Sequence, residues 1–243
     1  MNSSSIHLLI GNPSYDGTVH NLHSHISALT QSRIPTSVKH MTFTSSILTL
    51  NFNTLWCTAL NLRSQGEITH FLLWHADVKP HQPDWLDILL NEMIRTDVDV
   101  LATSIPIKDK RGLTSTAIDT DKWNPIRLTQ SQILDMPETW SMPNLLVNTG
   151  LLLIDMRHPW TEQICFTMND RITQDANGMF RASVEPEDWN FSRQCHSLGT
   201  KLAVTRKVTV DHYGTNAWSS DEAWGQDADY QTASSFEFSY EEI

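Results

Sequence analysis

The stretch Phe71-Leu72-Leu73-Trp74-His75-Ala76-Asp77-Val78 decides the fold class of this 243-residue chain. Its first half is an unbroken apolar run, which is typical of a strand buried on both faces of a parallel sheet. Asp77 follows almost at once and is therefore expected at the carboxyl edge of that sheet, where open α/β folds bind ligands. A carboxylate there suits a hard cation such as Mn²⁺ or Mg²⁺, but aspartate also caps helices. These residues alone leave both interpretations open.

Strand and helix patterns alternate around this stretch and predict an α/β fold with a largely parallel central sheet flanked by helices. Short apolar runs predict strands over residues 6–10, 37–43, 71–74 and 98–105. Apolar residues at helical spacing predict helices over residues 18–29, 47–62 and 85–94. A turn is expected at 11–14 and a loop system at 108–143. Strand character follows over 145–154, broken at 148–150, then a helix over 186–198 and a last strand over 201–210.

Composition limits the class of protein. Hydrophobic residues make up 40% and charged residues 19%, an ordinary globular balance. The three scattered cysteines show no CxxC spacing, so neither a disulfide framework nor a zinc ribbon is indicated. A net charge of −11 argues against general nucleic-acid binding. No apolar run is long enough to span a bilayer, and residues 1–5 lack the basic region of a signal peptide, so we expect a cytoplasmic protein.

The sequence predicts one large domain over residues 1–220 and an acidic tail over residues 221–243. The tail contains no Lys or Arg, which is typical of a solvated terminus. Its aromatic residues indicate instead that it packs on the domain or on a partner; they are Trp224, Tyr230, Phe236, Phe238 and Tyr240.

Two more segments carry residues suited to chemistry. Glu187 and Asp188 open the predicted helix after Pro186, where the helix dipole favours anions and explains one acid more readily than two. His212 follows the last predicted strand. An aspartate and a histidine from distant segments, such as Asp77 and His212, suit a shared Mn²⁺ ion, whereas a lone histidine is commonly structural.

Taken in this order, the motifs resemble those of a GT-A fold glycosyltransferase, close to the family 2 type, over residues 6–218. The segment Leu9–Gly17 resembles the first strand and nucleotide-binding turn, which implies contacts from Asn12, Pro13, Ser14, Tyr15 and Asp16. Asn53 matches the second residue of an Arg-Asn pair, with Phe52 in place of the arginine. The DxD position holds His75-Ala76-Asp77, so a histidine replaces the first acid of the motif. The resemblance implies that this tripeptide binds the nucleotide and that Asp77 binds the metal.

The later motifs extend the resemblance. Asn148-Thr149-Gly150 resembles the segment that lines the donor sugar and the acceptor, and His212-Tyr213-Gly214 resembles the HxG motif whose histidine completes the metal shell. Glu187-Asp188-Trp189 resembles the ED motif, which implies that Asp188 is the base of an inverting transfer; a retaining transfer would not need one. Further donor or acceptor contacts are expected from Lys108, Trp189 and Trp218, although a solvated lysine and core tryptophans are ordinary alternatives.

The expected function is therefore a metal-dependent glycosyltransferase that moves a sugar from a UDP- or GDP-sugar to an acceptor hydroxyl, with Mn²⁺ or Mg²⁺ as cofactor. One alternative is a nucleotidyltransferase, which would need a glycine-rich, basic phosphate loop after the first strand; residues 12–17 are neither. The other is a non-catalytic module that binds a nucleotide sugar or a glycan and has lost the first acid of its DxD motif. The sequence does not specify the acceptor.

Overall fold

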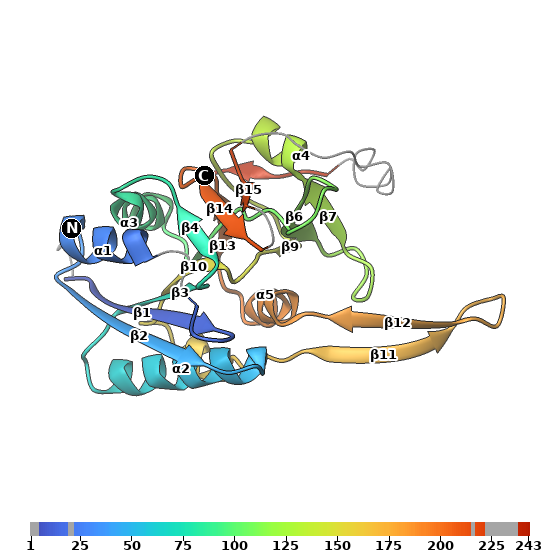
Figure 1. Cartoon of the computed structure of the whole chain (residues 1–243), viewed down its shortest axis with the longest axis horizontal. Helices are drawn as coiled ribbons and strands as arrows, with labels where there is room; N and C mark the ends of the chain where they lie inside the picture. The colour runs from blue at the N-terminus through green and yellow to red at the C-terminus, as the bar shows by residue number, and fades with distance from the viewer. Residues whose placement is uncertain (1–4, 19–21, 215–216, 222–237) are drawn as a thin grey trace.

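The computed structural model describes residues 5–18, 22–214, 217–221 and 238–243, and its centre is an eight-stranded sheet between two helical layers (Figure 1). The helices are α1 Leu22–Gln31, α2 Leu48–Ser64, α3 Trp85–Thr96, α4 Gln130–Asp135, α5 Glu187–Ser197 and the short 3-10 helix η1 Pro159–Gln163. The large sheet contains β1 His7–Ser14, β2 Ser37–Thr44, β3 His70–Trp74, β5 Val100–Thr103, β8 Thr139–Ser141, β10 Leu151–Asp155, β13 Leu202–Thr205 and β16 Glu241–Glu242. Smaller sheets contain β4 Val78–Pro80, β6 Leu113–Ile118, β7 Ile126–Thr129, β9 Leu145–Leu146, β11 Asn169–Gln174, β12 Phe180–Glu185, β14 Val210–Tyr213 and β15 Ala217–Ser219.

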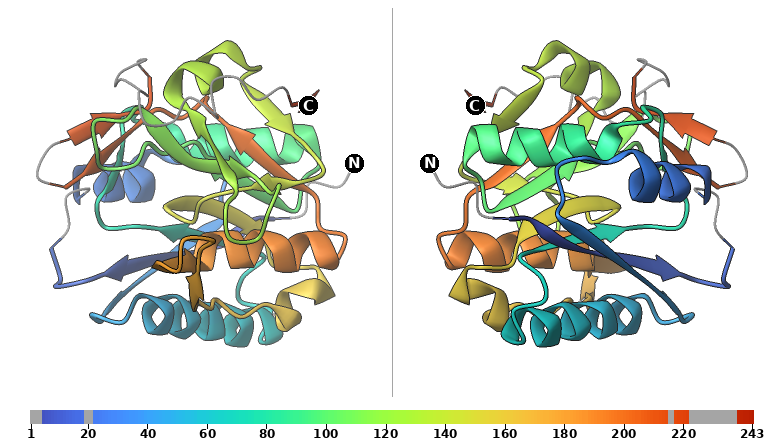
Figure 2. Two further views of the ribbon diagram at one scale, coloured as in Figure 1. Left: turned by 90° about the vertical axis from the view of Figure 1, so that its right-hand side faces the viewer. Right: turned by 90° about the vertical axis from the view of Figure 1, so that its left-hand side faces the viewer.

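The central strands bury side chains on both faces, which explains their unbroken apolar sequences. Along β3, Phe71 and Leu73 join the core beneath α2 and α5, whereas Leu72 and Trp74 join the core beneath α1 and α3. This alternation follows the two-residue period of a strand. Figure 2 shows the resulting order of layers, with helices on both sides of the sheet. The α/β class predicted from the sequence is therefore confirmed.

The direction of the strands is mixed. The order is β16-β8-β13-β5-β10-β3-β1-β2; β1, β2 and β3 are mutually parallel, and so are β5 and β13. In contrast, β10 runs antiparallel between β3 and β5, and β8 runs antiparallel to β13. The expectation of a largely parallel sheet missed these reversals. The chain enters β10 from β9 and residues 147–150, at the carboxyl edge of β3, so it must cross the sheet in the opposite direction.

The segment 108–143 contains regular structure where the sequence predicted loops. β6 and β7 form a three-stranded sheet with β9, and α4 begins with a capping box between Thr129 and Gln132. Threonines occupy core positions of β6 that apolar residues usually fill. Thr114 is fully buried, and its hydroxyl donates to the Leu128 carbonyl at 2.9 Å. These β-branched polar residues suit a strand but conceal it from a search for apolar runs.

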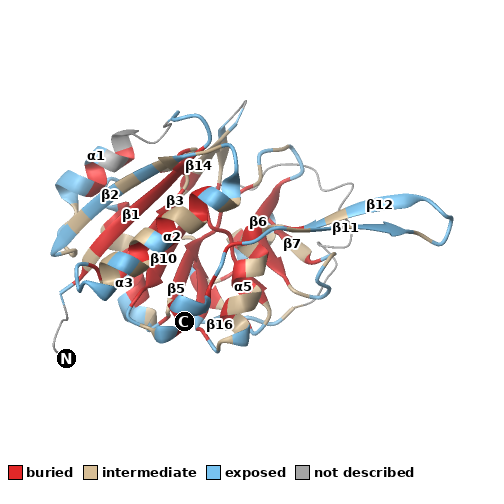
Figure 3. Ribbon diagram, turned by 90° about the horizontal axis from the view of Figure 1, so that it is seen from below, coloured by how far each residue is buried: buried red, intermediate tan, exposed pale blue. Residues whose placement is uncertain are grey.

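Other element boundaries also differ from those predicted. β1 continues to Ser14 through the expected turn, and it tolerates Pro13 because its pairing with β3 ends at Gly11, which leaves one edge open. The expected strand over 201–210 is two strands, β13 and β14. The hairpin of β11 and β12 was not predicted. It projects from the body of the protein and is largely exposed (Figure 3). Its apolar residues Ile172 and Phe180 are among the exposed ones.

The end of the acidic tail belongs to the large sheet. β16 pairs with β8 at the sheet edge, and Tyr240 packs edge-on against Trp140 with ring centroids 6.3 Å apart. Residues 222–237, with Trp224, Tyr230 and Phe236, lie outside the described residues. Within the described part of the chain, no helix is both long and apolar enough to cross a membrane.

Candidate functional site

A cavity of about 480 Å³ opens at the carboxyl edge of β1 and β3. Its volume lies within the range of small-molecule sites, about 300–1,000 Å³. The lining residues are Pro13, Ser14, Tyr15, Asp16, Thr18, Ser45, Ser46, Leu48, Asn51, His75, Ala76, Asp77 and Tyr213. The cavity therefore brings together seven of the nine residues predicted to bind a nucleotide, from two segments about sixty residues apart.

Ser14 organises the turn that forms one wall of the cavity. Its hydroxyl accepts a hydrogen bond from the Gly17 amide at 2.9 Å and donates to the Thr18 carbonyl at 3.3 Å. Gly17 has a φ of 86°, a left-handed conformation that favours glycine. The Asp16 carboxylate accepts from the Thr18 amide at 2.8 Å. The side chain of Tyr15 is 73% exposed and stands at the rim of the cavity.

The two remaining predicted nucleotide contacts, Asn12 and Asn53, do not line the cavity. The Asn12 amide is buried and donates to the Trp74 carbonyl at 2.5 Å, which ties β1 to β3. Asn53 binds the backbone of Phe166 with both polar atoms, at 2.8 and 2.9 Å. Asn51, which sequence reasoning missed, lines the cavity instead, and its amide donates to the carbonyls of Ser14 and Ser45.

Asp77 and His212 meet beside the cavity. The Tyr213 amide donates to the Asp77 carbonyl at 2.8 Å, which joins β14 to the turn after β3. His212 Nε2 lies 3.7 Å from Asp77 Oδ2, and His212 Nδ1 donates to the Pro106 carbonyl at 2.7 Å. With Nδ1 bound to the Pro106 carbonyl, Nε2 is the ring nitrogen that faces Asp77.

This pair fits a cation that arrives together with a phosphate ligand. Asp77 and His212, whose Oδ2 and Nε2 atoms lie 3.7 Å apart, would be the protein ligands of such an ion. Mg²⁺ in proteins commonly has one or two carboxylate ligands and takes the rest from phosphates and water. Among the described residues no group of three or more His, Cys, Asp or Glu side chains is arranged to hold a metal. A site with a complete set of protein ligands is therefore not present in this part of the chain.

The electrostatics of the site favour an ionised Asp77 beside a neutral His75. Burial acts to raise the pKa of Asp77, but the close approach of His212 and the charge of Lys108 outweigh it and hold this pKa below its usual range. Lys108 Nζ contacts Asp77 Oδ2 directly. Burial lowers the pKa of His75 to about 4, so this ring is neutral at pH 7.

His75 and Phe52 contact each other. They stand where the resembling motifs have the first acid of DxD and the arginine of the Arg-Asn pair. Their ring centroids are 5.1 Å apart. The His75 amide donates to the Gly150 carbonyl at 2.8 Å, and its Nε2 lies 3.4 Å from the Thr149 hydroxyl. His75 therefore packs between α2 and residues 147–150 rather than extending into solvent.

Residues 148–150 are buried and tightly packed. Asn148 uses its side chain internally, donating to the Thr103 carbonyl at 2.6 Å and accepting from the Gly150 amide at 3.0 Å. A Cβ on Gly150 would lie 2.6 Å from Ile105 Cδ1, which explains the glycine. Thr149 is the member of this motif whose hydroxyl approaches His75.

The acidic pair opens α5 after Pro186, as the sequence predicted. Burial and the charge of Glu187 raise the pKa of Asp188 to about 7, while the nearby Arg127 acts in the opposite direction. Burial also raises the pKa of Glu187. Asp188 accepts from the Trp189 amide at 2.8 Å. A carboxyl group whose pKa lies near 7 is suited to accept a proton at neutral pH.

Ser192 links this first turn of α5 to residues 147–150. Its hydroxyl donates to the Asp188 carbonyl at 2.9 Å and accepts from the Val147 amide at 3.0 Å. From Val147 the chain leads directly to Thr149, beside His75. A short run of contacts therefore connects Asp188 to the cavity, although Asp188 does not line the cavity itself.

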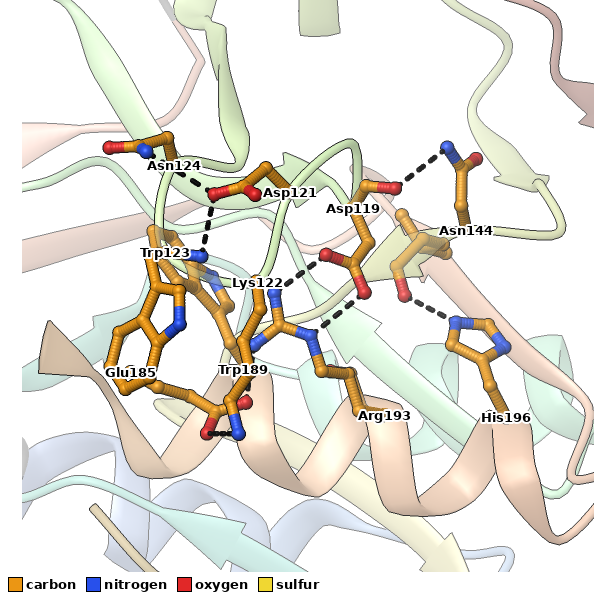
Figure 4. Close-up of polar contacts among 12 residues, drawn as sticks. Asp119, Asp121, Lys122, Trp123, Asn124, Asn144, Glu185, Trp189, Arg193 and His196 are labelled. Carbon is orange, nitrogen blue, oxygen red and sulfur yellow. Dashed lines mark hydrogen bonds and ion pairs between the residues drawn. The ribbon is translucent and has the colours of Figure 1, made fainter. Parts of the chain in front are cut away.

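An ionic network holds the outer face of α5 in place (Figure 4). Arg193 binds the Asp119 carboxylate at 2.6 and 2.8 Å and Glu185 at 2.5 Å, and Lys122 binds Glu185 at 3.1 Å. His196 Nε2 lies 2.7 Å from the Leu145 carbonyl. The network joins α5 to the loop after β6 and to the base of the β11–β12 hairpin, which fixes the position of the acidic pair.

The two tryptophans differ in their surroundings. Trp189 is buried, packs with Ala117 and Leu146, and donates from Nε1 to the Ser115 carbonyl at 3.2 Å. Arg127 stacks on its ring at 4.4 Å. Trp218 is partly exposed and lies directly opposite His212 in the β14–β15 pair. Neither tryptophan lines the cavity.

Comparisons with known proteins bear on the fold of this chain. A scan against protein-family models gave no match, and a search of curated proteins also gave none. Among solved structures, the chain is similar to one titled "Crystal Structure of A197 from STIV", with a TM-score of 0.55 and 14% sequence identity. The match covers 91% of this chain and 94% of A197. At this identity the likeness concerns the fold, and it extends over nearly the whole length of both chains.

Proposed function

We propose that this protein is a GT-A fold glycosyltransferase that uses a nucleotide-diphosphate sugar and a divalent cation, Mn²⁺ or Mg²⁺. The observation that carries the proposal is the connected site. Asp77 and His212 meet at the edge of a nucleotide-sized cavity, and Ser192 and residues 147–149 connect that cavity to a carboxyl group of raised pKa, Asp188.

Each part of the site has a role in this proposal. The turn at residues 13–16 holds the nucleoside, because it leaves β1 at the edge where α/β folds bind ligands. Asp77 and His212 hold the cation, which when bound supplies Lewis-acid stabilisation to the leaving diphosphate. Lys108 adds a positive charge on the same side. Asp188 accepts the proton of the acceptor hydroxyl in an inverting transfer, a role supported by its raised pKa.

The experiment is a screen of UDP- and GDP-sugars for release of nucleoside diphosphate. Purified protein is incubated with each donor in Mn²⁺ or Mg²⁺, and released UDP or GDP is quantified. We expect one donor to give turnover that EDTA abolishes. Nucleotide-sugar binding by calorimetry without turnover of any donor, in the presence of a panel of sugar and lipid acceptors, would favour the non-catalytic binding module instead.

A further inference from the structure

Lys108 contacts an oxygen atom that also belongs to the proposed metal site. Its ammonium group contacts Oδ2 of Asp77, the same oxygen that faces His212 Nε2 at 3.7 Å. The side chains of Lys108 and Asp77 are 39% and 30% exposed, so the ion pair is only partly shielded from water. A lysine ammonium and a divalent cation would therefore compete for one carboxylate oxygen.

The backbone around the site is shaped to let Lys108 reach Asp77. The lysine stem crosses Gly214, where a Cβ would lie 3.0 Å from Lys108 Cδ and 3.6 Å from its Cβ and Cγ. Two residues before the lysine, the Pro106 carbonyl accepts the hydrogen bond from the ring of His212. The segment that carries Lys108 is thus tied to the same histidine that faces Asp77.

We propose that Lys108 is an internal counterion that occupies the cation site of the free protein and turns to the diphosphate when nucleotide and metal bind together. This inference rests on the proposed function. A partly buried carboxylate without a partner is costly, so Lys108 stabilises Asp77 while the site is empty. A divalent cation must displace the ammonium and would repel it at close range. The released ammonium, still close by, then binds the phosphates.

The consequence is a cation site that discriminates against metal without nucleotide. Mn²⁺ alone must break the Lys108–Asp77 pair and gains no new partner for the lysine. Mn²⁺ with UDP breaks the same pair but provides phosphate oxygens for the ammonium. Lys108 therefore weakens binding of the ion alone and strengthens binding of the ion with its nucleotide.

The test measures Mn²⁺ affinity by the electron paramagnetic resonance signal of the free ion, with and without UDP. Lys108→Ala should bind Mn²⁺ alone about 1.4- to fivefold more tightly, since breaking a solvent-accessible ion pair costs about 0.2–1 kcal/mol. In UDP the same variant should bind Mn²⁺ no more tightly than the wild type, and UDP itself more weakly. Lys110→Ala, in the same loop, is the matched control and should leave both affinities unchanged.

A second variant moves Lys108 and keeps its charge. Gly214 does not have a left-handed φ, so Gly214→Ala is expected to fold and to displace the flexible lysine stem. It should raise the affinity for Mn²⁺ alone, as Lys108→Ala does, while retaining UDP affinity. If Mn²⁺ alone binds Lys108→Ala as weakly as the wild type, or more weakly, the counterion inference is wrong even when Mn²⁺–UDP binding is intact. If no form binds Mn²⁺ with or without UDP, the metal-dependent function itself is wrong.

Discussion

Replacing Asp188 with asparagine should stop sugar transfer and at the same time stabilise the protein. The pKa of Asp188 is raised from 3.8 to about 7, and burial is the largest cause. One pKa unit corresponds to 1.36 kcal/mol, so ionised Asp188 lowers the free energy of unfolding by up to about 4 kcal/mol above pH 7. Asparagine carries no charge, and its Oδ1 can still accept the hydrogen bond from the Trp189 amide.

The sign of the pH dependence follows from the two pKa values. Between pH 4 and pH 7 the folded state keeps a proton on Asp188 that the unfolded state has lost, so this group reduces stability progressively as pH rises through that window. Asp188→Asn should therefore be close to the wild type near pH 4 and more stable at pH 8. Glu187 shares the buried site and the burden of the raised pKa values, so we expect Asp188→Asn to recover only part of this difference. The free energy of unfolding should rise by about 1–2 kcal/mol. For a chain of this size that raises Tm by roughly 2–8 °C.

Differential scanning calorimetry at pH 4.5 and pH 8, together with the donor assay, tests this prediction. Loss of a general base costs about 10²–10⁴-fold in rate while donor binding is retained. The control is Asp170→Asn, at an exposed position of β11, which should change neither quantity. If Asp188 served only to stabilise the first turn of α5, worth about 0.3–1 kcal/mol, the variant would have a lower Tm at pH 8 and normal turnover, and the assignment would be refuted. Product stereochemistry must be read alongside, since a retaining enzyme would also keep its rate.

Three more predictions concern the cavity and the packing around it. Asp77→Ala should abolish Mn²⁺–UDP binding in calorimetry while circular dichroism stays unchanged; undiminished affinity would remove Asp77 from the metal site. In a nucleotide-bound crystal structure, the base should contact residues 13–15, and a base bound elsewhere contradicts this. Gly150→Ala places a Cβ 2.6 Å from Ile105 Cδ1 and should cost about 1–3 kcal/mol in chemical denaturation; an unchanged midpoint would show that Ile105 can move aside.

The sequence could predict the centre of this fold because its signals there are local. The apolar run at residues 71–74 needs burial on both faces, and such a strand ends at a ligand-binding edge in most α/β arrangements. The acidic pair after Pro186 likewise marks a helix start by its own chemistry. Both features depend on neighbouring residues in the chain, which a single sequence contains.

Features that depend on helix rotation or on buried polar residues were missed. Asn51 and Asn53 are two positions apart on α2, about 200° around the helix axis, so only one of them can face the cavity; the motif pointed to Asn53 and the structure places Asn51 there. The strand β6 was missed because threonines such as Thr114 fill its core positions. Their burial depends on partners in β7 that are distant in sequence.

The contact between Phe52 and His75 has a consequence for the charge of the proposed metal site. In the resembling motifs these positions hold an arginine and an acid, one charge of each sign; here both are neutral at pH 7, because burial lowers the pKa of His75 to about 4. Asp77 is then the carboxylate that remains in the segment 75–77, and Lys108 forms an ion pair with it. A site with so little negative charge attracts a divalent cation weakly by itself. Under the proposed function we therefore expect the diphosphate to bring most of the charge that holds the ion, so that metal and nucleotide binding depend on each other.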